Sequence, residues 1–212
     1  MYGEELGKEN VLPLAFVFAD PADLLCDERE GLVACGRAAV HARFSVAEES
    51  GEGEDALVKS SDGLMVRRHD LRLAQAISRP DGVDQGKQWV HVDLSEQTLV
   101  AYLGDDPVYA TLVSSGKEGY ATPTGLFRVY YKHVTARMAA DDEREGPYDI
   151  GEVPWVMYYD GSYALHGAYW HNTFGLVRSH GCTNLAPADA RWLFYWSEPA
   201  MPRGWHSLYI GN

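Results

Sequence analysis

Cys182 and two histidines are the residues of this sequence whose types and spacing could do chemistry together. A thiol attacks a carbonyl as the thiolate, and a neighbouring imidazolium can lower the thiol pKa. His180 lies two positions before Cys182, so on an extended backbone both side chains leave the same face, while His166 ends an earlier strand-like segment. Gly181 lets a substrate carbonyl approach closely, and its N–H and that of Cys182 could hold an oxyanion. These residues outline a site for acyl transfer.

Each residue alone would indicate little, because a lone histidine on a strand is usually structural and a lone cysteine usually behaves as a small hydrophobic residue. Together they form the string Ser179-His180-Gly181-Cys182-Thr183-Asn184-Leu185, with His166 sixteen residues before the cysteine and followed by Gly167. This combination resembles the signature of the L,D-transpeptidase (YkuD-like) catalytic domain family. Further similarity lies in the strand-like run from Trp89 to Val113, in the segment Ala121-Thr122-Pro123-Thr124-Gly125-Leu126-Phe127, and in Ala188-Asp189-Ala190 near the start of a helix.

The resemblance implies a role for each matching residue. Cys182 would be the nucleophile, and His166 would be its base and later its proton donor, oriented by the backbone carbonyl of Gly167. His180 would be a further catalytic residue that also shapes the pocket. The N–H groups of Gly181 and Cys182 would stabilise the oxyanion. No cofactor and no metal is expected for this chemistry.

The resemblance also implies a substrate pocket, formed by Ser179, Tyr148, Asn184 and Arg178, with residues Met138 to Gly151 as part of a lid. Tyr148 would add its hydroxyl to the oxyanion site, although its place beside Gly146-Pro147 is equally typical of a turn. Many family members carry arginine where this chain has Asn184, so the substrate contact at that position stays open. Arg178 and Arg137 are candidate donors to a carboxylate, although exposed arginines usually have no such duty.

The implied substrate is a peptidoglycan stem tetrapeptide. Cys182 would cleave the bond between the third residue, a diamino acid, and the D-alanine at position four, and D-alanine would leave. The thioester would then pass to an amine of another stem as a 3→3 crosslink, to a lysine of an envelope protein, to a D-amino acid, or to water. The sequence does not choose among these acceptors. The resemblance thus implies a part in cell wall biogenesis and cell shape, and acylation by carbapenems.

Three other interpretations stay open. Hydrolysis of the same acyl-enzyme would make the protein an L,D-carboxypeptidase, and a fold without activity would be a non-catalytic wall-binding module. His166, His180 and Cys182, with His171 or Asp149, could instead bind zinc. The sequence has no Cys-x-x-Cys ligand pair and no obvious carboxylate base beside these residues, which disfavours both structural and catalytic zinc sites.

The elements that must position these residues are mostly strands. Alternating residues predict strands at 89–94, 98–103 and 108–113, and further strands are expected at 126–134, 153–159, 163–166 and 205–210. One main helix is expected to begin at Pro187 and to run through Trp196. The predicted fold class is therefore mostly β: a β-sandwich or β-meander catalytic domain over residues 87–212, with one helix after the cysteine motif.

Residues 1–80 are predicted to form a separate small β-rich module of unknown role, without a chemical motif. The acidic, Gly-rich stretch between Ser45 and Lys59 is expected to be an exposed hairpin loop or a mobile insertion, and residues 79–86 a linker. Cys26 and Cys35 lie nine positions apart and form the natural disulfide pair, although they could equally be small buried residues. Cys182 is then the one free thiol.

The composition excludes several partner classes. A chain of 212 residues with 46% apolar residues can bury a large core, and its net charge of −13 disfavours nucleic acid and anionic lipid. No apolar run approaches the roughly 20 residues that a membrane helix needs. The start of the chain lacks the pattern of a signal peptide. We expect a place in the cell envelope, in the periplasm, and an exported protein of this kind would be a mature or trimmed form.

Overall fold

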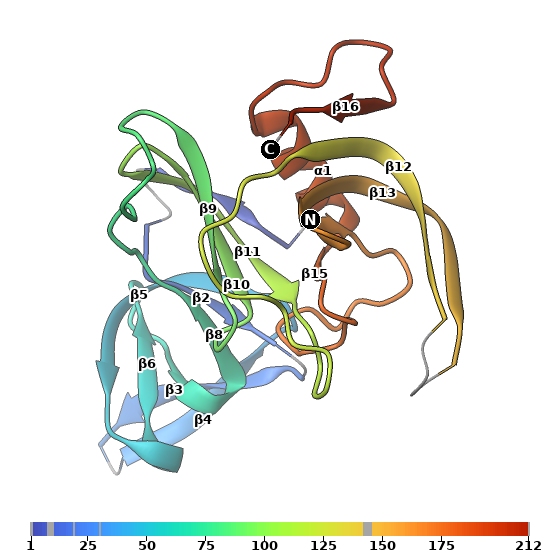
Figure 1. Ribbon diagram of the computed structural model, residues 1–212. Coiled ribbons are helices and arrows are strands. Elements are labelled where there is room, and N and C mark those ends of the chain that lie inside the picture. Colours follow the sequence, from blue (N-terminus) through green and yellow to red (C-terminus); the bar gives the residue numbers. More distant parts are fainter. Residues whose placement is uncertain (1, 8–10, 19, 30, 142–145, 212) are drawn as a thin grey trace. The chain divides into compact units, whose positions relative to one another are not determined.

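The computed structural model describes residues 2–7, 11–18, 20–29, 31–141 and 146–211. Within these residues the chain is mostly β, with one α-helix, α1 (Pro187–Trp196), as the sequence predicted. Figure 1 shows strands along most of the chain and the helix near its end. The chain divides into two compact units, Tyr2–Leu112 with Thr173–Leu176, and Val113–Asn172 with Val177 onward. None of the described helices is long and apolar enough to cross a membrane.

The first unit contains a seven-stranded sheet in the order β4-β3-β7-β6-β5-β2-β8. Its strands are β2 (Leu14–Val17), β3 (Ala22–Glu28), β4 (Gly31–Ala38), β5 (Arg43–Ser50), β6 (Leu57–Ser60), β7 (Met65–Arg67) and β8 (Leu71–Ala74). Two short 3₁₀ turns, η1 (Gly53–Asp55) and η2 (Arg68–Asp70), lie between them. A core that includes Val17, Val58 and Leu73 holds the sheet together, because burying such side chains stabilises each by about 1.5–3 kcal/mol.

The acidic stretch is only partly the loop that the sequence predicted. Glu48 lies in β5 and pairs with Lys59 of β6, so the loop is confined to residues 51–56. Antiparallel pairing satisfies the backbone of these acidic residues while their side chains stay in water. The antiparallel pairing of β5 and β6 confirms the expected exposed hairpin and makes its loop shorter than expected.

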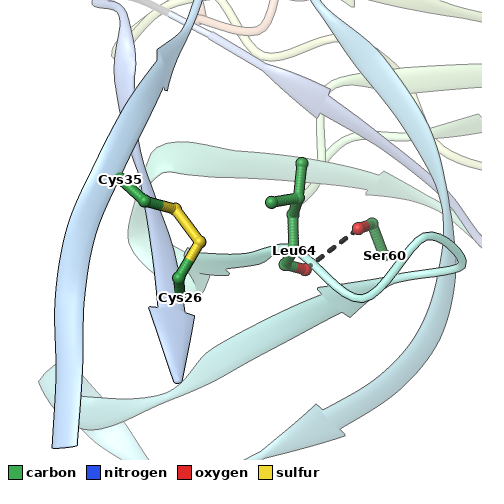
Figure 2. The surroundings of a disulfide bond; sticks show 4 residues. All are labelled: Cys26, Cys35, Ser60 and Leu64. Carbon is green, nitrogen blue, oxygen red and sulfur yellow. Dashed lines mark hydrogen bonds between the residues drawn. A yellow bond between two sulfur atoms is a disulfide. The ribbon is translucent and has the colours of Figure 1, made fainter. Parts of the chain in front are cut away.

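A disulfide joins Cys26 of β3 to Cys35 of β4, with 5.8 Å between the two Cα atoms, as Figure 2 shows. Cys35 is exposed, so the alternative that the two cysteines are small buried residues is wrong. Nearby, the Ser60 hydroxyl donates a hydrogen bond to the Leu64 carbonyl at 3.0 Å and closes the turn between β6 and β7.

The remaining strands of the first unit are β1 (Glu4–Glu5), β9 (Gln88–Asp93), β10 (Thr98–Leu103) and most of β11 (Asp106–Ser114). β9, β10 and β11 are antiparallel neighbours, as the alternating pattern predicted, and β1 pairs with β11. β11 continues into the second unit at Val113.

The second unit is built on strands in the order β16-β12-β13-β14-β15, and β15 pairs with the end of β11. Their bounds are β12 (Tyr131–Ala140), β13 (Tyr148–Asp160), β14 (Tyr163–Gly167), β15 (Thr183–Leu185) and β16 (Ser207–Tyr209). β12 begins later than the predicted strand at 126–134. It also runs further, because its pairing with β13 stabilises residues 135–140, which carry no local strand pattern. β14 and β15 are parallel, which aligns His166 with Asn184.

The two faces of this second sheet differ. α1 packs against β13 and β14 on one face, where Leu193 and Phe194 are buried. Lys132 is fully buried, and its ammonium donates to the carbonyls of Phe194 (2.6 Å) and Ser197 (2.8 Å) at the end of α1. Burial lowers the pKa of Lys132 to about 8. The lysine thus satisfies carbonyls that the last helical turn leaves without partners.

Candidate active site

The loop that carries the cysteine motif is fastened to residues 115–117. The N–H groups of Arg178 and Ser179 donate to the Ser115 carbonyl at 2.9 and 3.0 Å, and the Lys117 N–H donates to the Ser179 carbonyl at 3.0 Å. Gly116 and Ser179 form an isolated parallel bridge. Each end of the motif therefore has a fixed backbone, since β15 begins at Thr183.

Thr122 links the predicted Thr-Pro segment to the cysteine motif. Its hydroxyl donates to the Gly181 carbonyl at 2.8 Å and accepts from the Gly116 N–H at 2.9 Å. The side chain is buried. One hydroxyl thus joins two loops that lie far apart in the sequence and orients the peptide before Cys182.

Gly181 has φ +109°, a conformation that residues with a Cβ rarely adopt, and a Cβ there would lie 2.4 Å from Cε1 of Tyr163. Its N–H donates to the Ser179 hydroxyl at 3.0 Å, and that hydroxyl donates to the Cys182 carbonyl. The N–H of Gly181 is therefore engaged within the motif. Gly181 contributes its backbone conformation, and its predicted role as an oxyanion donor would require this hydrogen bond to break.

Cys182 is a half-buried free thiol that packs beside Val153, Val156 and Ala164. Its sulfur donates to the Ser162 carbonyl at 3.6 Å. Burial raises the pKa of the Cys182 thiol, and a backbone hydrogen bond from Ala164 opposes the rise in part. The resting residue is therefore a neutral thiol at pH 7.

His166 is 3% exposed, at the end of β14. Burial lowers the pKa of His166 to about 4, the hydrogen bond to Gly167 opposes this, and His171 adds to it. Nδ1 lies 3.2 Å from the Gly167 carbonyl, the contact that the sequence resemblance implied. Burial thus favours the neutral form of both groups, which opposes the imidazolium–thiolate pair that the residue spacing suggested.

The structure gives the thiol and the imidazole different hydrogen-bond partners. Among the described residues, the Cys182 thiol bonds to Ser162 and not to His166. Long or misaligned catalytic hydrogen bonds are common before substrate binds.

His180 lies between two tyrosine rings. The Tyr148 ring stacks on it with 5.1 Å between centroids, and the Tyr120 ring meets it edge-on at 4.6 Å. The ammonium of Lys117 lies over the Tyr120 ring at 5.1 Å. The structure thus brings Tyr148 to the cysteine motif, as predicted, while sequence reasoning missed Tyr120 and Lys117, which precede the Thr-Pro segment and carry no motif of their own.

Asn184 is 3% exposed, and its amide nitrogen lies 3.2 Å from Nε2 of His171. Its Oδ1 atom is buried without a partner among the described residues. Burial, with a smaller effect from Arg178, lowers the pKa of His171 to about 4. The sequence singled out His171 only as a possible zinc ligand, and its pairing with Asn184 depends on the parallel register of β14 and β15.

The two arginines that the sequence offered as carboxylate donors, Arg137 and Arg178, differ in their surroundings. Arg137 and Asp149 form a two-pronged ion pair across β12 and β13, with Nε to Oδ1 at 2.7 Å, whereas Arg178 is exposed beside the motif. The predicted lid, Met138 to Gly151, consists of the end of β12, the start of β13 and the connection between them. Its residues 142–145 lie outside the described part of the chain. Within the described residues, no group of three or more His, Cys, Asp or Glu side chains could hold a metal ion.

Comparisons with known proteins agree with this geometry. A family model described as the L,D-transpeptidase catalytic domain matches residues 87–203, more than half of the chain. A comparison with curated proteins gave no match.

Three solved structures give the scale of the structural likeness. A cysteine-to-serine mutant of Enterococcus faecium L,D-transpeptidase is 19% identical, over 83% of this chain and 71% of that one, with a TM-score of 0.50. The E. faecium catalytic domain acylated by ertapenem is 24% identical, over 61% and 100% of the two chains, with a TM-score of 0.48. A Mycobacterium smegmatis L,D-transpeptidase is 14% identical, over 99% and 90%, with a TM-score of 0.49. At 19% identity and a TM-score of 0.50, the likeness to the E. faecium mutant supports a shared fold.

Proposed function

Because the chain belongs to the L,D-transpeptidase catalytic domain family, we propose that it is a cysteine-dependent enzyme acting on the stem peptides of peptidoglycan. The observation that carries this proposal is that the free thiol of Cys182 directly precedes β15, whose parallel pairing with β14 sets Asn184 opposite His166. The loop that carries the thiol is fastened to residues 115–117. This arrangement supports the proposal of an acyl-transfer site at Cys182.

The acylation step uses His166 as a general base. Cys182 Sγ forms a bond to the carbonyl carbon of the third stem residue while the imidazole takes the thiol proton. The bond from that carbon to the nitrogen of D-alanine then breaks, and the imidazole returns the proton to the leaving amine. Because burial favours the neutral forms of both groups, we propose that proton transfer accompanies attack.

The tetrahedral oxyanion needs hydrogen-bond donors close to Cys182. We assign this role to the Cys182 N–H and the Tyr148 hydroxyl, because the Gly181 N–H already has a partner in Ser179. Such donors are worth about 3–4 kcal/mol each at the transition state. Tyr148 stacks on His180, so that ring serves to hold the tyrosine in place.

The pocket is proposed to consist of Ser179, Tyr148, His180, Asn184 and Arg178. Arg178 is exposed next to the motif and can receive a substrate carboxylate. Asn184 lies within hydrogen-bond distance of His171, whose charge would lower the pKa of His166, so we propose that Asn184 orients His171 beside the pocket. The buried, unpartnered Oδ1 of Asn184 leaves one further acceptor in this region.

The acceptor that resolves the thioester is one of four: an amine of another stem, a lysine of an envelope protein, a D-amino acid, or water. A peptidoglycan substrate places the protein in the cell envelope, with the periplasm as the proposed compartment. We also propose the division into a β module at 1–80 and a catalytic domain at 87–212. The seven-stranded sheet falls within the first range and the family match within the second.

One experiment tests this proposal. The protein is incubated with disaccharide tetrapeptides, and released D-alanine and dimers are followed by mass spectrometry beside the Cys182→Ala and His166→Gln variants. Release of D-alanine with dimers by the unaltered protein alone supports the transpeptidase. Tripeptide without dimers identifies an L,D-carboxypeptidase. Binding of the substrate with no product from any protein identifies a wall-binding module, and activity lost on chelation would identify a metal enzyme.

A further inference from the structure

Four aromatic rings form a row across three neighbouring strands of the second unit. Tyr209 of β16 is opposite Tyr131 of β12, which is opposite Tyr158 of β13, and His133 lies two residues along β12. Figure 1 shows these strands side by side. The ring centroids are 5.7 Å apart for Tyr209 and Tyr131, 4.1 Å for Tyr131 and His133, and 5.9 Å for His133 and Tyr158. We name these four residues the aromatic row.

The aromatic row lies on the sheet face opposite α1. Residues directly opposite each other on antiparallel strands share a face, and successive residues alternate between faces. Lys132, between Tyr131 and His133, reaches α1, so its two neighbours face the other way. The row therefore occupies the sheet face that α1 does not cover.

The aromatic row is continuous with the candidate active site. Tyr158, at one end of the row, and Cys182 pack against the same cluster of Val153, Val156 and Ala164. At the other end, β16 is the last strand of the sheet, and Tyr209 is 64% exposed there. A ligand bound at the thiol would therefore lie near Tyr158, and Tyr209 presents an exposed ring at the edge of the sheet.

The chemistry of the row favours a neutral, hydroxyl-rich ligand. Burial lowers the pKa of His133, so its ring is uncharged at neutral pH. The net charge of −13 opposes binding of polyanions. Tyrosine combines a broad apolar ring with a polar tip, and a pyranose ring combines an apolar C–H face with hydroxyl groups at its rim. Stacking of a pyranose ring on a tyrosine ring buries both apolar faces and leaves the sugar hydroxyls free to form hydrogen bonds.

We propose that the aromatic row binds the sugar rings of the glycan strand that bears the stem peptide attached to Cys182. This rests on the proposed function. Three extended stem residues span about 10 Å. β12 is three strands from β15, which is about 14 Å at a spacing of about 4.8 Å. The sugar therefore reaches Tyr131 and His133 once the stem and its link to the sugar lie over β14 and β13.

The test compares two donors, the free tetrapeptide and the disaccharide tetrapeptide. In the variant with both Tyr131→Ala and Tyr209→Ala, KM for the disaccharide donor should rise about tenfold, equivalent to about 1.4 kcal/mol, while kcat and the KM for the free tetrapeptide stay unchanged. Tyr131→Phe with Tyr209→Phe should restore most of the loss, because the rings are retained. Tyr195→Ala is the matched control, since Tyr195 is 50% exposed on α1.

A second measurement does not depend on turnover. Peptide-free glycan chains are titrated into the Cys182→Ala protein with and without the two alanine substitutions. Weaker glycan binding by the substituted protein supports glycan binding at the aromatic row even if no D-alanine release is ever seen. If the unaltered enzyme is active but has the same KM for the two donors, the proposal for the aromatic row is wrong and the proposed function stands. An equal loss of activity with both donors would show that the two tyrosines stabilise the fold or act in the catalytic site. A change in sedimentation would make the row an interface between copies of the chain. Either result overturns the proposal.

Discussion

Removal of the Thr122 hydroxyl should weaken both the fold and the reaction. Thr122→Val keeps the shape of the side chain but leaves the Gly181 carbonyl and the Gly116 N–H without their partner. Gly181 is buried, so its unpaired carbonyl costs about 1–3 kcal/mol, and Gly116 is half-buried, so its loss is smaller, about 0.5–1.5 kcal/mol. The free energy of unfolding should fall by about 2–4 kcal/mol.

The same substitution should slow acylation of Cys182, because the peptide between Gly181 and Cys182 would no longer be held. A displacement of about 1 Å near reacting atoms can cost about a hundredfold in rate. We expect a loss of about 10–100-fold in the rate at which a carbapenem adds to the protein, followed by intact-protein mass spectrometry.

Thr122→Ser is the matched control, since it retains the hydroxyl. Urea unfolding of both variants gives the stability, and the carbapenem reaction gives the rate. If Thr122→Val unfolds within about 0.5 kcal/mol of the unaltered protein, the range usual for neutral surface substitutions, and reacts at the same rate, the inferred link between the two loops is wrong.

Three further predictions concern stability. Between pH 6.5 and pH 4 the free energy of unfolding should fall by about 3 kcal/mol on account of His166, because its pKa is about 4 when folded and rises to its ordinary value on unfolding. Urea titrations across this range should show a smaller fall in His166→Asn, and identical curves would refute the assignment. Lys132→Met should lower the free energy of unfolding by about 2–4 kcal/mol, since two helix-end carbonyls lose their donor; a thermal melt equal to that of the unaltered protein would contradict this. Replacing Cys26 and Cys35 with alanine should cost about 2–3 kcal/mol for a bridge that spans nine positions, while thiol labelling of Cys182 should proceed as before; slower labelling would show that the bridge matters to the site.

The proposed nucleophile and base could be singled out from the sequence because residue type and spacing carry the signal. Cys182 follows His180 at a fixed offset, and the resemblance supplied His166 from sixteen residues away. Their spatial relation depends on the parallel pairing of β14 with β15. That pairing needs a long connection and leaves no periodic signal in the sequence.

Charge states could not be predicted from the sequence. The direction of the pKa shifts at Cys182 and His166 is set mainly by burial, which depends on tertiary packing. A histidine near a cysteine suggests an ion pair only where both remain solvated or a further charge assists. The sequence argument considered proximity alone and left out the burial that opposes an ion pair.

The aromatic row and Lys132 were missed for a similar reason. Tyr131, Lys132 and His133 alternate along one strand, but the sequence does not say which face will be covered. Their roles follow from α1 packing on one face, and Tyr209 joins the row only through the register of β16. Long-range pairing decides both.

The central claim is that Cys182 carries the acyl group. Its most direct test is peptide mapping by mass spectrometry after the protein has reacted with a carbapenem. We predict an added mass equal to one drug molecule on the peptide that contains Cys182, and none in Cys182→Ala. An adduct on another residue, or equal labelling of the alanine variant, would contradict the account.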